Sequence, residues 1–525
     1  MKKYIALPLL LAMSLTSCGD FLDKEPVSDL APGNFFQNTE EMSNWNAGIY
    51  TSFQTALNQR QALFGDIRSD NCEKVQNYAN TNYYMNSILP TDNGANWQNF
   101  YQVITRANTA IKMYPTIPGV TEAQLAPYMG QAYAMRAYMY FWGTRAWGRM
   151  PLVDTEFTGD LATVSCPRAS LDDVRDQIYS DIEAAISYFS LANSSGKFYM
   201  TMAGVRSLKV EADMWYGRYE DAITDSEWFV NNSDFSLAKS EKEWKSIFEN
   251  PAASSEVIFA MHWDYASNGA NNGWPGLLGA SNTNNGWMLS QSLYDKFVDR
   301  LRCQDDNPEW GTDGRFWNTV DTVRLYYNAG RLPITYTMYD NMTTAAADRG
   351  ITNCIKYSPE DPEKAIDAAL GIYKSQWKVL TTTEAEHKLV FMRLANIMLL
   401  RAEALNKVGR GDEALAIVNS IRSRVGYVKD ANLDVDASDK DAVENLILDE
   451  RQLEFFGEGQ RWFDLMRTGK LVEVMDPVYR VRQEEAGVAV TGFGNEGTKY
   501  WPIYYREFES NTALKGDQNE PYTER

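Results

Sequence analysis

The sequence contains very little histidine and cysteine for a chain of 525 residues. Its two histidines, His262 and His387, provide almost no material for a metal site or a Ser-His-Asp triad. We therefore expect no cofactor and assign no residue to a metal site, although the sequence does not reveal whether a metal ion orders a loop. We expect both histidines in structural or surface positions. Four cysteines follow residue 18 without any CxxC spacing, and the sequence indicates no disulfide pairing among them: Cys72, Cys166, Cys303 and Cys354.

Positive charge is scarce as well, since 50 lysines and arginines face 70 acidic residues and give a formal net charge of −20. This balance argues against nucleic acid or anionic lipid as the main partner and favours neutral or cationic ligands. After the N-terminal segment, no apolar run approaches the length of a membrane span.

Common catalytic motifs are also missing, because the sequence has no P-loop, HExxH or GxSxG. Residues 492–497 satisfy GxGxxG, but the following Tyr500-Trp501-Pro502 cannot open a helix for a pyrophosphate, so we interpret this run as a hairpin or loop. Asp305-Asp306-Asn307 lacks the glycine and distal glutamate of an EF-hand loop. A glycoside hydrolase needs only two carboxylates, which leaves that activity formally open, although solvated helix faces explain most acidic residues.

The N-terminus has the features of a secretory signal. Lys2 and Lys3 precede an apolar stretch over residues 5–13, and Leu15-Thr16-Ser17-Cys18 is typical of a lipobox. We expect a signal peptide over residues 1–17, cleaved before a lipidated Cys18, and a flexible acidic tether over residues 18–38. Lipid on Cys18 would hold a soluble domain on a membrane at ~0.8 kcal/mol per buried CH₂ group. The alternative is an ordinary signal peptide with a cysteine nearby.

Apolar residues recur at helical spacing in nine segments, which predicts a largely helical protein. These segments are residues 39–57, 97–114, 121–147, 170–191, 200–217, 220–230, 386–408, 412–425 and 439–456. Asn38 or Thr39, Thr121 and Ser170 are suitable N-caps for three of them.

Two of the predicted helix pairs share a pattern. Ala212, Gly217 and Ala222 have the same offsets as Ala404, Gly409 and Ala414, so that small residues flank a tight turn in both pairs. Small residues at these positions allow close approach of antiparallel helices, as in tetratricopeptide repeats. True repeats would have to pack together across the inserted residues, and chance similarity of two hairpins is the alternative.

The pattern changes between residues 250 and 377. Residues 256–261 predict a short strand, and residues 267–287 combine asparagine and glycine with Trp274 and Trp287. The whole chain has 15 tryptophans, 30 tyrosines and 22 phenylalanines, and most of them are expected in the core. Amide groups beside indole faces match the hydroxyls and the C–H face of a sugar. An ordered surface lobe with tryptophan anchors explains this composition equally well.

Several segments together resemble the SusD/RagB family of outer-membrane nutrient-binding lipoproteins. They are residues 136–153, 393–404, 414–424 and 450–465, the closing residues Trp501-Pro502-Ile503, Glu507 and Asn511, and residues 18–26 as the mature N-terminus. The resemblance covers nearly the whole chain. One departure is Asp313-Gly314-Arg315-Phe316, where many members carry Asp-Pro-Arg, and it suggests a local variation of this loop.

The resemblance implies a mainly α-helical fold, in which tetratricopeptide-like helix pairs form a right-handed helical scaffold with an irregular loop-rich lobe and a few short strands. We expect one domain over residues 39–525. Its parts would be a helical region over 39–250, a ligand lobe over about 251–380, and C-terminal repeats with a closing segment over 381–525.

The resemblance also implies a non-enzymatic function. The protein would sit lipid-anchored on the cell surface at the outer membrane, capture an oligosaccharide or polysaccharide, and deliver it to a SusC-like TonB-dependent transporter as its lid. By position, the resemblance points to ligand contacts at Asp66, Arg68, Asp70, Asn71 and Trp97. Aromatic residues of the lobe would add a platform, and the candidates are Trp263, Trp274, Trp287, Tyr294, Trp310 and Trp317.

Three alternatives remain open from the sequence. The first is a surface glycoside hydrolase with an unrecognised carboxylate pair. The second is a helical-repeat scaffold that binds only protein, and the third is a member of the family that carries peptide. Neither the glycan nor the stoichiometry with the transporter follows from the residues.

Overall fold

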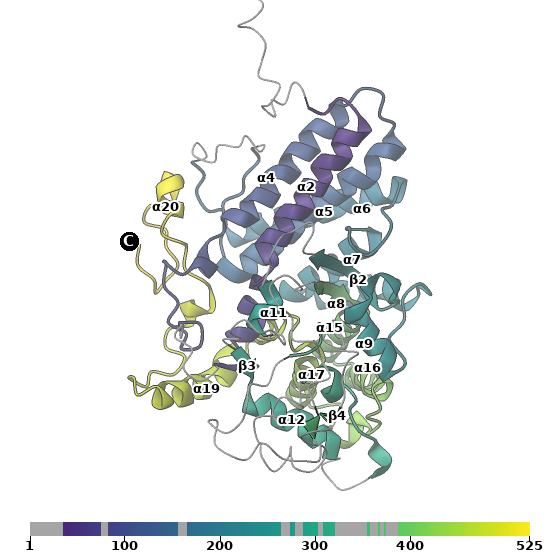
Figure 1. Cartoon of the computed structure of the whole chain (residues 1–525), viewed down its shortest axis with the longest axis vertical. Coiled ribbons are helices and arrows are strands. Elements are labelled where there is room, and N and C mark those ends of the chain that lie inside the picture. The colour runs from purple at the N-terminus through teal and green to yellow at the C-terminus, as the bar shows by residue number, and fades with distance from the viewer. Residues whose placement is uncertain are drawn as a thin grey trace, which may run out of the picture.

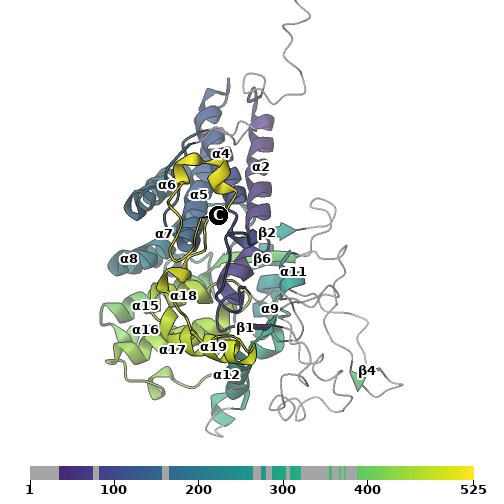
Figure 2. The ribbon, with the colours of Figure 1, turned by 90° about the vertical axis from the view of Figure 1, so that its left-hand side faces the viewer.

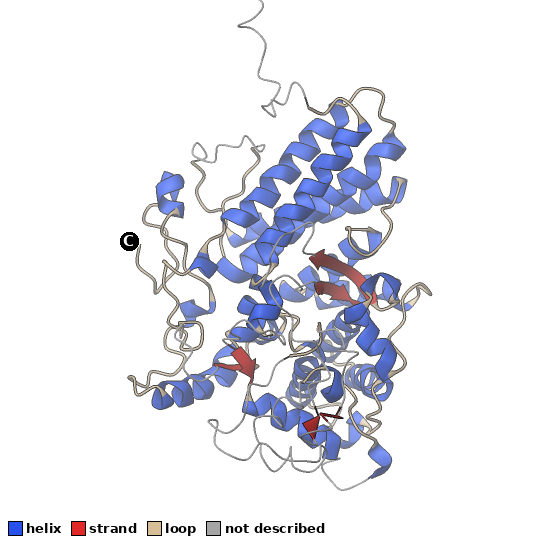
Figure 3. Cartoon of the chain, viewed as in Figure 1, coloured by secondary structure: helices blue, strands red, loops and turns tan. Residues whose placement is uncertain are grey.

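The computed structural model describes residues 35–74, 82–155, 165–263, 273–278, 287–302, 308–320, 354–357, 366–367, 372–373 and 387–524. The predictions for the signal peptide, Cys18, residues 18–34 of the tether and Cys303 lie outside these ranges. The last residues of the expected tether are packed rather than flexible, because Phe36 is buried against Trp45 and Tyr114. Within them the protein is mainly helical with a few short strands, as Figure 3 shows and as the sequence predicted.

Four long helices lie side by side in the upper part of Figures 1 and 2. They are α2 (Thr39–Leu57), α4 (Gln98–Met113), α5 (Glu122–Trp147) and α6 (Leu171–Leu191). The predicted N-caps Asn38, Thr121 and Ser170 each accept a hydrogen bond from a backbone N–H of the first turn, and the latter two form complete capping boxes. The start signals read from the sequence are therefore confirmed.

The two predicted helix pairs exist and pack against each other. The first is α7 (Met202–Trp215) with α8 (Tyr219–Val230), and the second is α15 (Leu394–Lys407) with α16 (Gly411–Arg424). Gly217 and Gly409 occupy the turns with φ of 72° and 86°, a conformation that glycine adopts without a steric penalty. Helix α15 lies against α8, and Arg401 donates to the Ile223 carbonyl and to Ser226 Oγ at 2.9 Å. The prediction that these pairs meet across the insertion is confirmed.

The prediction of one helix over residues 386–408 is wrong. Residues His387–Arg393 form strand β6, which pairs antiparallel with β2 (Val257–Trp263), and α15 begins only at Leu394. Six of the seven residues of β6 are buried, so burial does not alternate along the strand, and residues 389–392 form a continuous apolar run. Periodicity cannot separate such a run from a buried helix. The strand predicted over residues 256–261 is confirmed as β2.

Shorter strands and helices connect the long helices, the helix pairs and the β2–β6 strand pair. Two further antiparallel pairs are β1 (Cys72–Lys74) with β3 (Trp287–Leu289), and β4 (Ile366–Asp367) with β5 (Ile372–Tyr373). The remaining helices discussed below or drawn in Figure 1 are α3 (Arg60–Ala62), η1 (Leu63–Ile67), α9 (Glu241–Glu249), α11 (Gly273–Leu277), α12 (Gln291–Arg302), α17 (Lys440–Phe455), α18 (Arg461–Arg467), α19 (Leu471–Glu485), η9 (Glu496–Lys499) and α20 (Glu507–Ser510). The GxGxxG run lies in a loop that enters η9, so the loop interpretation is confirmed.

The closing segment, residues 500–524, returns from α19 to the upper helices along one side of the molecule (Figure 2). Trp501 N–H donates to the Ala146 carbonyl at 2.8 Å, and Tyr505 N–H donates to the Pro90 carbonyl at 3.0 Å. These bonds place α20 beside the start of α4. Within the described ranges, no helix is both long and apolar enough to span a membrane. Cys72, Cys166 and Cys354 are free thiols.

Candidate functional site: a pocket between helix α4 and the closing segment

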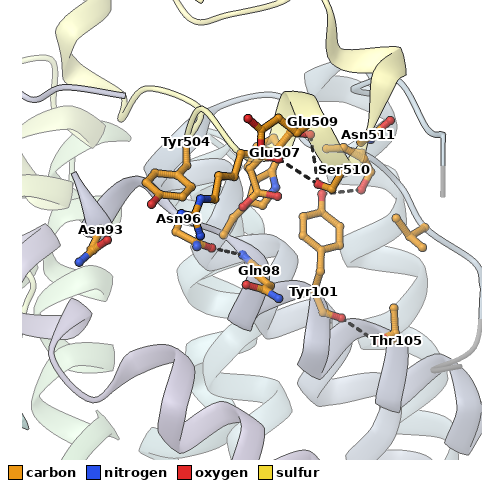
Figure 4. A pocket seen from close by; sticks show the side chains of 14 residues that line it. Asn93, Asn96, Gln98, Tyr101, Thr105, Tyr504, Glu507, Glu509, Ser510 and Asn511 are labelled. Carbon is orange, nitrogen blue, oxygen red and sulfur yellow. Dashed lines mark hydrogen bonds between the residues drawn. The ribbon is translucent and has the colours of Figure 1, made fainter. Parts of the chain in front are cut away.

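A pocket of about 660 Å³ lies between the start of α4 and the closing segment. We call it the closing-segment pocket. Its lining combines carboxamide side chains with aromatic rings and two glutamates, and Figure 4 shows most of these residues. The lining residues are Asn93, Asn96, Trp97, Gln98, Tyr101, Thr105, Pro151, Val153, Tyr504, Arg506, Glu507, Glu509, Ser510 and Asn511.

Hydrogen bonds hold both walls of this pocket in place. On α4, Tyr101 donates its hydroxyl to the Pro151 carbonyl at 2.8 Å, which fixes the ring against the connection after α5. In the closing segment, Asn511 accepts from Cys166 N–H at 3.0 Å and donates to the Cys166 carbonyl at 2.7 Å. The walls are therefore preformed rather than assembled from loose surface side chains.

Glu507 is the half-buried carboxylate of the pocket. Burial raises the pKa of Glu507 to about 7, although hydrogen bonds from the Trp97 indole and backbone N–H groups and the charge of Arg60 act in the opposite direction. Among the described residues Glu507 has no ion-pair partner. The carboxylate is thus held in place by neutral donors without a counter-charge in contact.

A smaller pocket of about 370 Å³ is lined by Asn93, Gly94 and Asn99 from the same stretch, and Asn93 lines both pockets. Its lining includes Tyr83, Trp287 and Arg60. Arg60 donates to the carbonyl groups of Asn93 at 3.3 Å and Asn96 at 2.9 Å. Arg60 therefore fixes the short wall that separates the two pockets.

The four polar positions expected as ligand contacts around residue 70 are buried. Asp66 accepts from the N–H groups of Gly457 and Gly459 and from Asn71 Nδ2, and burial raises its pKa to about 7 against these bonds. Arg68 stacks on Trp462, with the guanidinium carbon 4.1 Å from the ring centroid, and donates to the Thr498 carbonyl at 2.6 Å.

Asp70 belongs to the same buried group. Burial alone would raise its pKa, but the Arg461 guanidinium at 2.9 Å outweighs burial and lowers the pKa. Asn71 shares the Gln452 amide with Asp70. At 0–8% exposure, these four side chains connect the η1 region to α17, α18 and η9. None of these four side chains lines either of the two pockets.

Most of the expected lobe aromatics also have core positions. Trp274 is fully buried and donates its indole N–H to the Gly457 carbonyl at 3.0 Å, and Trp263 stacks on His387 with centroids 5.1 Å apart. Tyr294 packs edge-on against Phe316. Trp310 is half-buried beneath Lys429, and the side chain of Trp317 lies outside the described part. These positions match the alternative in which tryptophans anchor the lobe, and no shared platform is formed by the described rings.

Two of the expected residues do reach a pocket. Trp97 lines the closing-segment pocket and Trp287 lines the smaller one. Tyr101, Tyr504, Asn96 and Glu507 were not among the expected ligand contacts. The signal that could have found them is the run Asn93 to Asn99, which has the same mixture of carboxamides, glycine and tryptophan as residues 267–287. In the described ranges, no group of histidine, cysteine and acidic side chains could hold a metal ion.

Comparison with known proteins identifies the family. The SusD family model matches residues 255–522, and a second model, described as starch-binding and associating with the outer membrane, matches residues 20–204. The chain belongs to the SusD family. SusD-like protein P38 of Formosa agariphila is 28% identical over 563 aligned residues, which cover 99% of this chain and 100% of that protein.

Solved SusD-like structures have the same fold. A SusD superfamily protein from Bacteroides vulgatus aligns with a TM-score of 0.69 at 18% identity and covers 91% of this chain and 98% of that one. A laminarin-binding SusD-like protein aligns with a TM-score of 0.67 at 19% identity, covering 93% and 100%. The family resemblance and the fold class predicted from the sequence are confirmed.

Proposed function

We propose that this SusD family protein captures an oligosaccharide or polysaccharide without cleaving it, and that the closing-segment pocket contacts the glycan. The observation that carries this proposal is the lining of the pocket. Four carboxamide side chains, those of Asn93, Asn96, Gln98 and Asn511, surround the rings of Trp97, Tyr101 and Tyr504. Amides pair with sugar hydroxyls, and aromatic rings pack against the C–H face of a pyranose.

The smaller pocket extends the same site. Asn93 lines both pockets, and Trp287 and Tyr83 supply aromatic surface on the far side of the wall. A linear glycan that crosses residues 93–96 would contact both pockets. Of the expected lobe aromatics with described side chains, we propose only Trp287 as a ligand contact.

Location and delivery follow from the N-terminus and the family. The lipobox at Leu15-Thr16-Ser17-Cys18 supports lipid attachment at Cys18, and the family model's description supports association with the outer membrane. The part of the expected tether that precedes the packed Phe35 and Phe36 would let the domain tilt as a lid over a SusC-like TonB-dependent transporter, to which it would deliver the captured glycan. A Cys18→Ala chain that still reached the cell surface and supported uptake would contradict this part of the proposal.

Affinity electrophoresis of the purified mature chain against a panel of polysaccharides tests the binding function. We expect retarded migration in at least one neutral glycan and no release of reducing ends from it. Tyr504→Ala should weaken the retained binding about tenfold, because one stacking face is lost. Tyr199→Ala is the matched control, since Tyr199 is 43% exposed and lies outside both pockets.

Other outcomes identify the rival functions. Release of reducing ends would favour a glycoside hydrolase. Absence of binding to every glycan, together with co-purification with a transporter, would favour a protein-binding scaffold. Equal loss in Tyr504→Ala and Tyr199→Ala would place the ligand elsewhere.

A further inference from the structure

We propose that the closing-segment pocket contains a subsite for a ligand ammonium group, formed by the Glu507 carboxylate among aromatic rings, so that the captured saccharide carries free amines. The proposal rests on the proposed function and narrows its ligand class. It requires a carboxylate that is accessible and held in position, and that has no counter-charge in contact. The aromatic rings around it are a further observation.

The first requirement is met by the position of Glu507 in the pocket wall. The side chain is half-buried, and Figure 4 shows it between Tyr504 and Tyr101 in that view. Trp97 donates to the carboxylate from its backbone and its indole. A carboxylate has about four acceptor positions, so two remain for a ligand after these two bonds. The Trp97 bonds fix the orientation of the group without consuming it.

The second requirement is the shortage of positive charge around Glu507. Among the described residues that line the pocket there is no lysine, and the one arginine, Arg506, is exposed and donates to the Tyr505 hydroxyl at 2.9 Å. Arg60 is within electrostatic range, but its guanidinium donates to the carbonyl groups of Ala56, Asn93 and Asn96. Glu509 adds a second negative charge to the same pocket. A cation bound here would supply the missing counter-charge.

The third observation is the type of surface around the carboxylate. Trp97, Tyr101 and Tyr504 line the pocket together with Glu507. Aromatic rings attract an ammonium group through their negative faces, and the strength of this attraction increases where water is displaced. The raised pKa of Glu507, to about 7, has the same origin in an incompletely compensated, desolvated charge. The net charge of −20 would further attract a cationic glycan.

The test compares glucosamine hexamers with N-acetylglucosamine hexamers of the same linkage, alongside the neutral glycan retained in the electrophoresis panel. Isothermal titration calorimetry at 300 mM salt suppresses general attraction to the acidic surface. We expect the wild-type chain to bind the free-amine hexamer about tenfold more tightly than the acetylated one, as for one charge-assisted hydrogen bond. Glu507→Gln should reduce this preference to within about twofold, because the amide keeps the shape but loses the charge.

Glu484→Gln is the matched control, since it makes the same charge change at an exposed position outside both pockets. It should retain the preference. Equal weakening of all ligands by Glu507→Gln would assign Glu507 a purely structural role and overturn the proposal. Equal wild-type affinity for the two hexamers, with neutral glycan binding intact, would overturn the ammonium subsite and leave the proposed function standing. Failure to bind any glycan would instead overturn the proposed function.

Discussion

The closing-segment pocket and the buried interior beneath α17 both contain glutamates, but their carboxylates have opposite surroundings. We call the interior group the charge cluster, and it comprises Glu256, Asp313, Arg315, Lys356, Arg393, Arg422, Arg424, Glu450, Glu454 and Glu458, all at most 8% exposed. In the charge cluster every carboxylate contacts a guanidinium or ammonium group. In the pocket, the donors to Glu507 from the described part of the chain are the neutral N–H groups of Trp97.

These surroundings shift the pKa values of the two kinds of glutamate in opposite directions. Burial would raise the pKa of Glu450, but Arg315, Arg300 and Arg422 outweigh it and lower the pKa to about 2. Burial raises the pKa of Glu507 to about 7, because the hydrogen bonds from Trp97 and the charge of Arg60 offset it only in part. Asp66 shows that a raised pKa alone does not mark a ligand site, since its oxygens are satisfied by backbone N–H groups and it lines neither pocket. A binding group needs both the missing counter-charge and a cavity.

The charge cluster also has a mechanical role. Arg315 donates to Asp313, Glu450 and Glu454, while Lys356 donates to Glu458 at 2.5 Å. Residues 313–315 and 356 belong to the lobe, whereas the three glutamates lie on α17 or just after it. The cluster therefore attaches two lobe segments to the helical scaffold, and the Asp-Gly-Arg variation noted in the sequence supplies two of its members.

The largest predicted effect comes from breaking the charge cluster at Arg393. Its guanidinium donates to Glu256 at 2.8 Å, to Glu454 at 2.5 Å and to Glu458 at 2.7 Å. Arg393→Met leaves buried negative charge uncompensated, so we expect a loss of ~3–5 kcal/mol in the free energy of unfolding, measured by urea denaturation. Arg410→Met removes an exposed arginine that pairs with Glu413 and should leave the urea midpoint unchanged. Equal midpoints for the two variants would contradict the assigned role of the cluster.

Arg393 also shows what the sequence could not predict. Caps, turn glycines and helix pairs follow from local patterns, and they were predicted correctly at Thr121, Ser170, Gly217 and Gly409. The run before Leu394 was misassigned because a buried strand and a buried helix have the same composition over seven residues. The cluster itself joins the residue before β2 with β6, α16, α17 and two lobe segments, which no local pattern brings together.

The candidate site was less predictable than the fold for the same reason. Glu507 matched the family's closing segment, and Trp97 was expected as a ligand contact, but their contact joins distant parts of the chain. Trp274 and Trp287 were chosen because tryptophan in a glycine- and asparagine-rich region resembles a binding loop. Composition does not distinguish a ring that lines a cavity from one that anchors the loop: Trp274 is fully buried, whereas Trp287, at 1% exposure, lines the smaller pocket.

A smaller, pH-dependent effect is predicted for Glu507. Its folded pKa of about 7 lies above the usual 4.5, so the folded state binds the proton more tightly and gains stability as the pH falls from 8 towards 5. Glu507→Gln cannot titrate. The free energy of unfolding of wild type relative to Glu507→Gln should therefore rise by roughly 1–3 kcal/mol between pH 8 and pH 5.

Urea denaturation at both pH values measures this difference, and Glu509→Gln should follow the wild-type trend. A difference of the opposite sign would mean that Glu507 has a counter-charge after all. It would then resemble Glu450, whose stabilising contribution is present above pH 4.5 and is lost as the pH falls towards 2.

The smallest effect on stability is predicted at Asn93, because its side chain is exposed whereas those of the charge cluster are buried and ion-paired. The Asn93 side chain is exposed and lines both pockets, while Arg60 holds the residue through its backbone carbonyl. Asn93→Ala keeps that carbonyl, so the free energy of unfolding should change by less than ~0.5 kcal/mol. Loss of one amide contact to a sugar should weaken glycan binding by roughly 2–10-fold.

Asn231→Ala, at the exposed end of α8, should change neither the free energy of unfolding nor the affinity for glycan. Calorimetric titration with the retained glycan separates the two variants, and equal affinities would remove Asn93 from the proposed site. A large loss of stability in Asn93→Ala would instead show that the wall between the pockets depends on its side chain, as the charge cluster depends on Arg393.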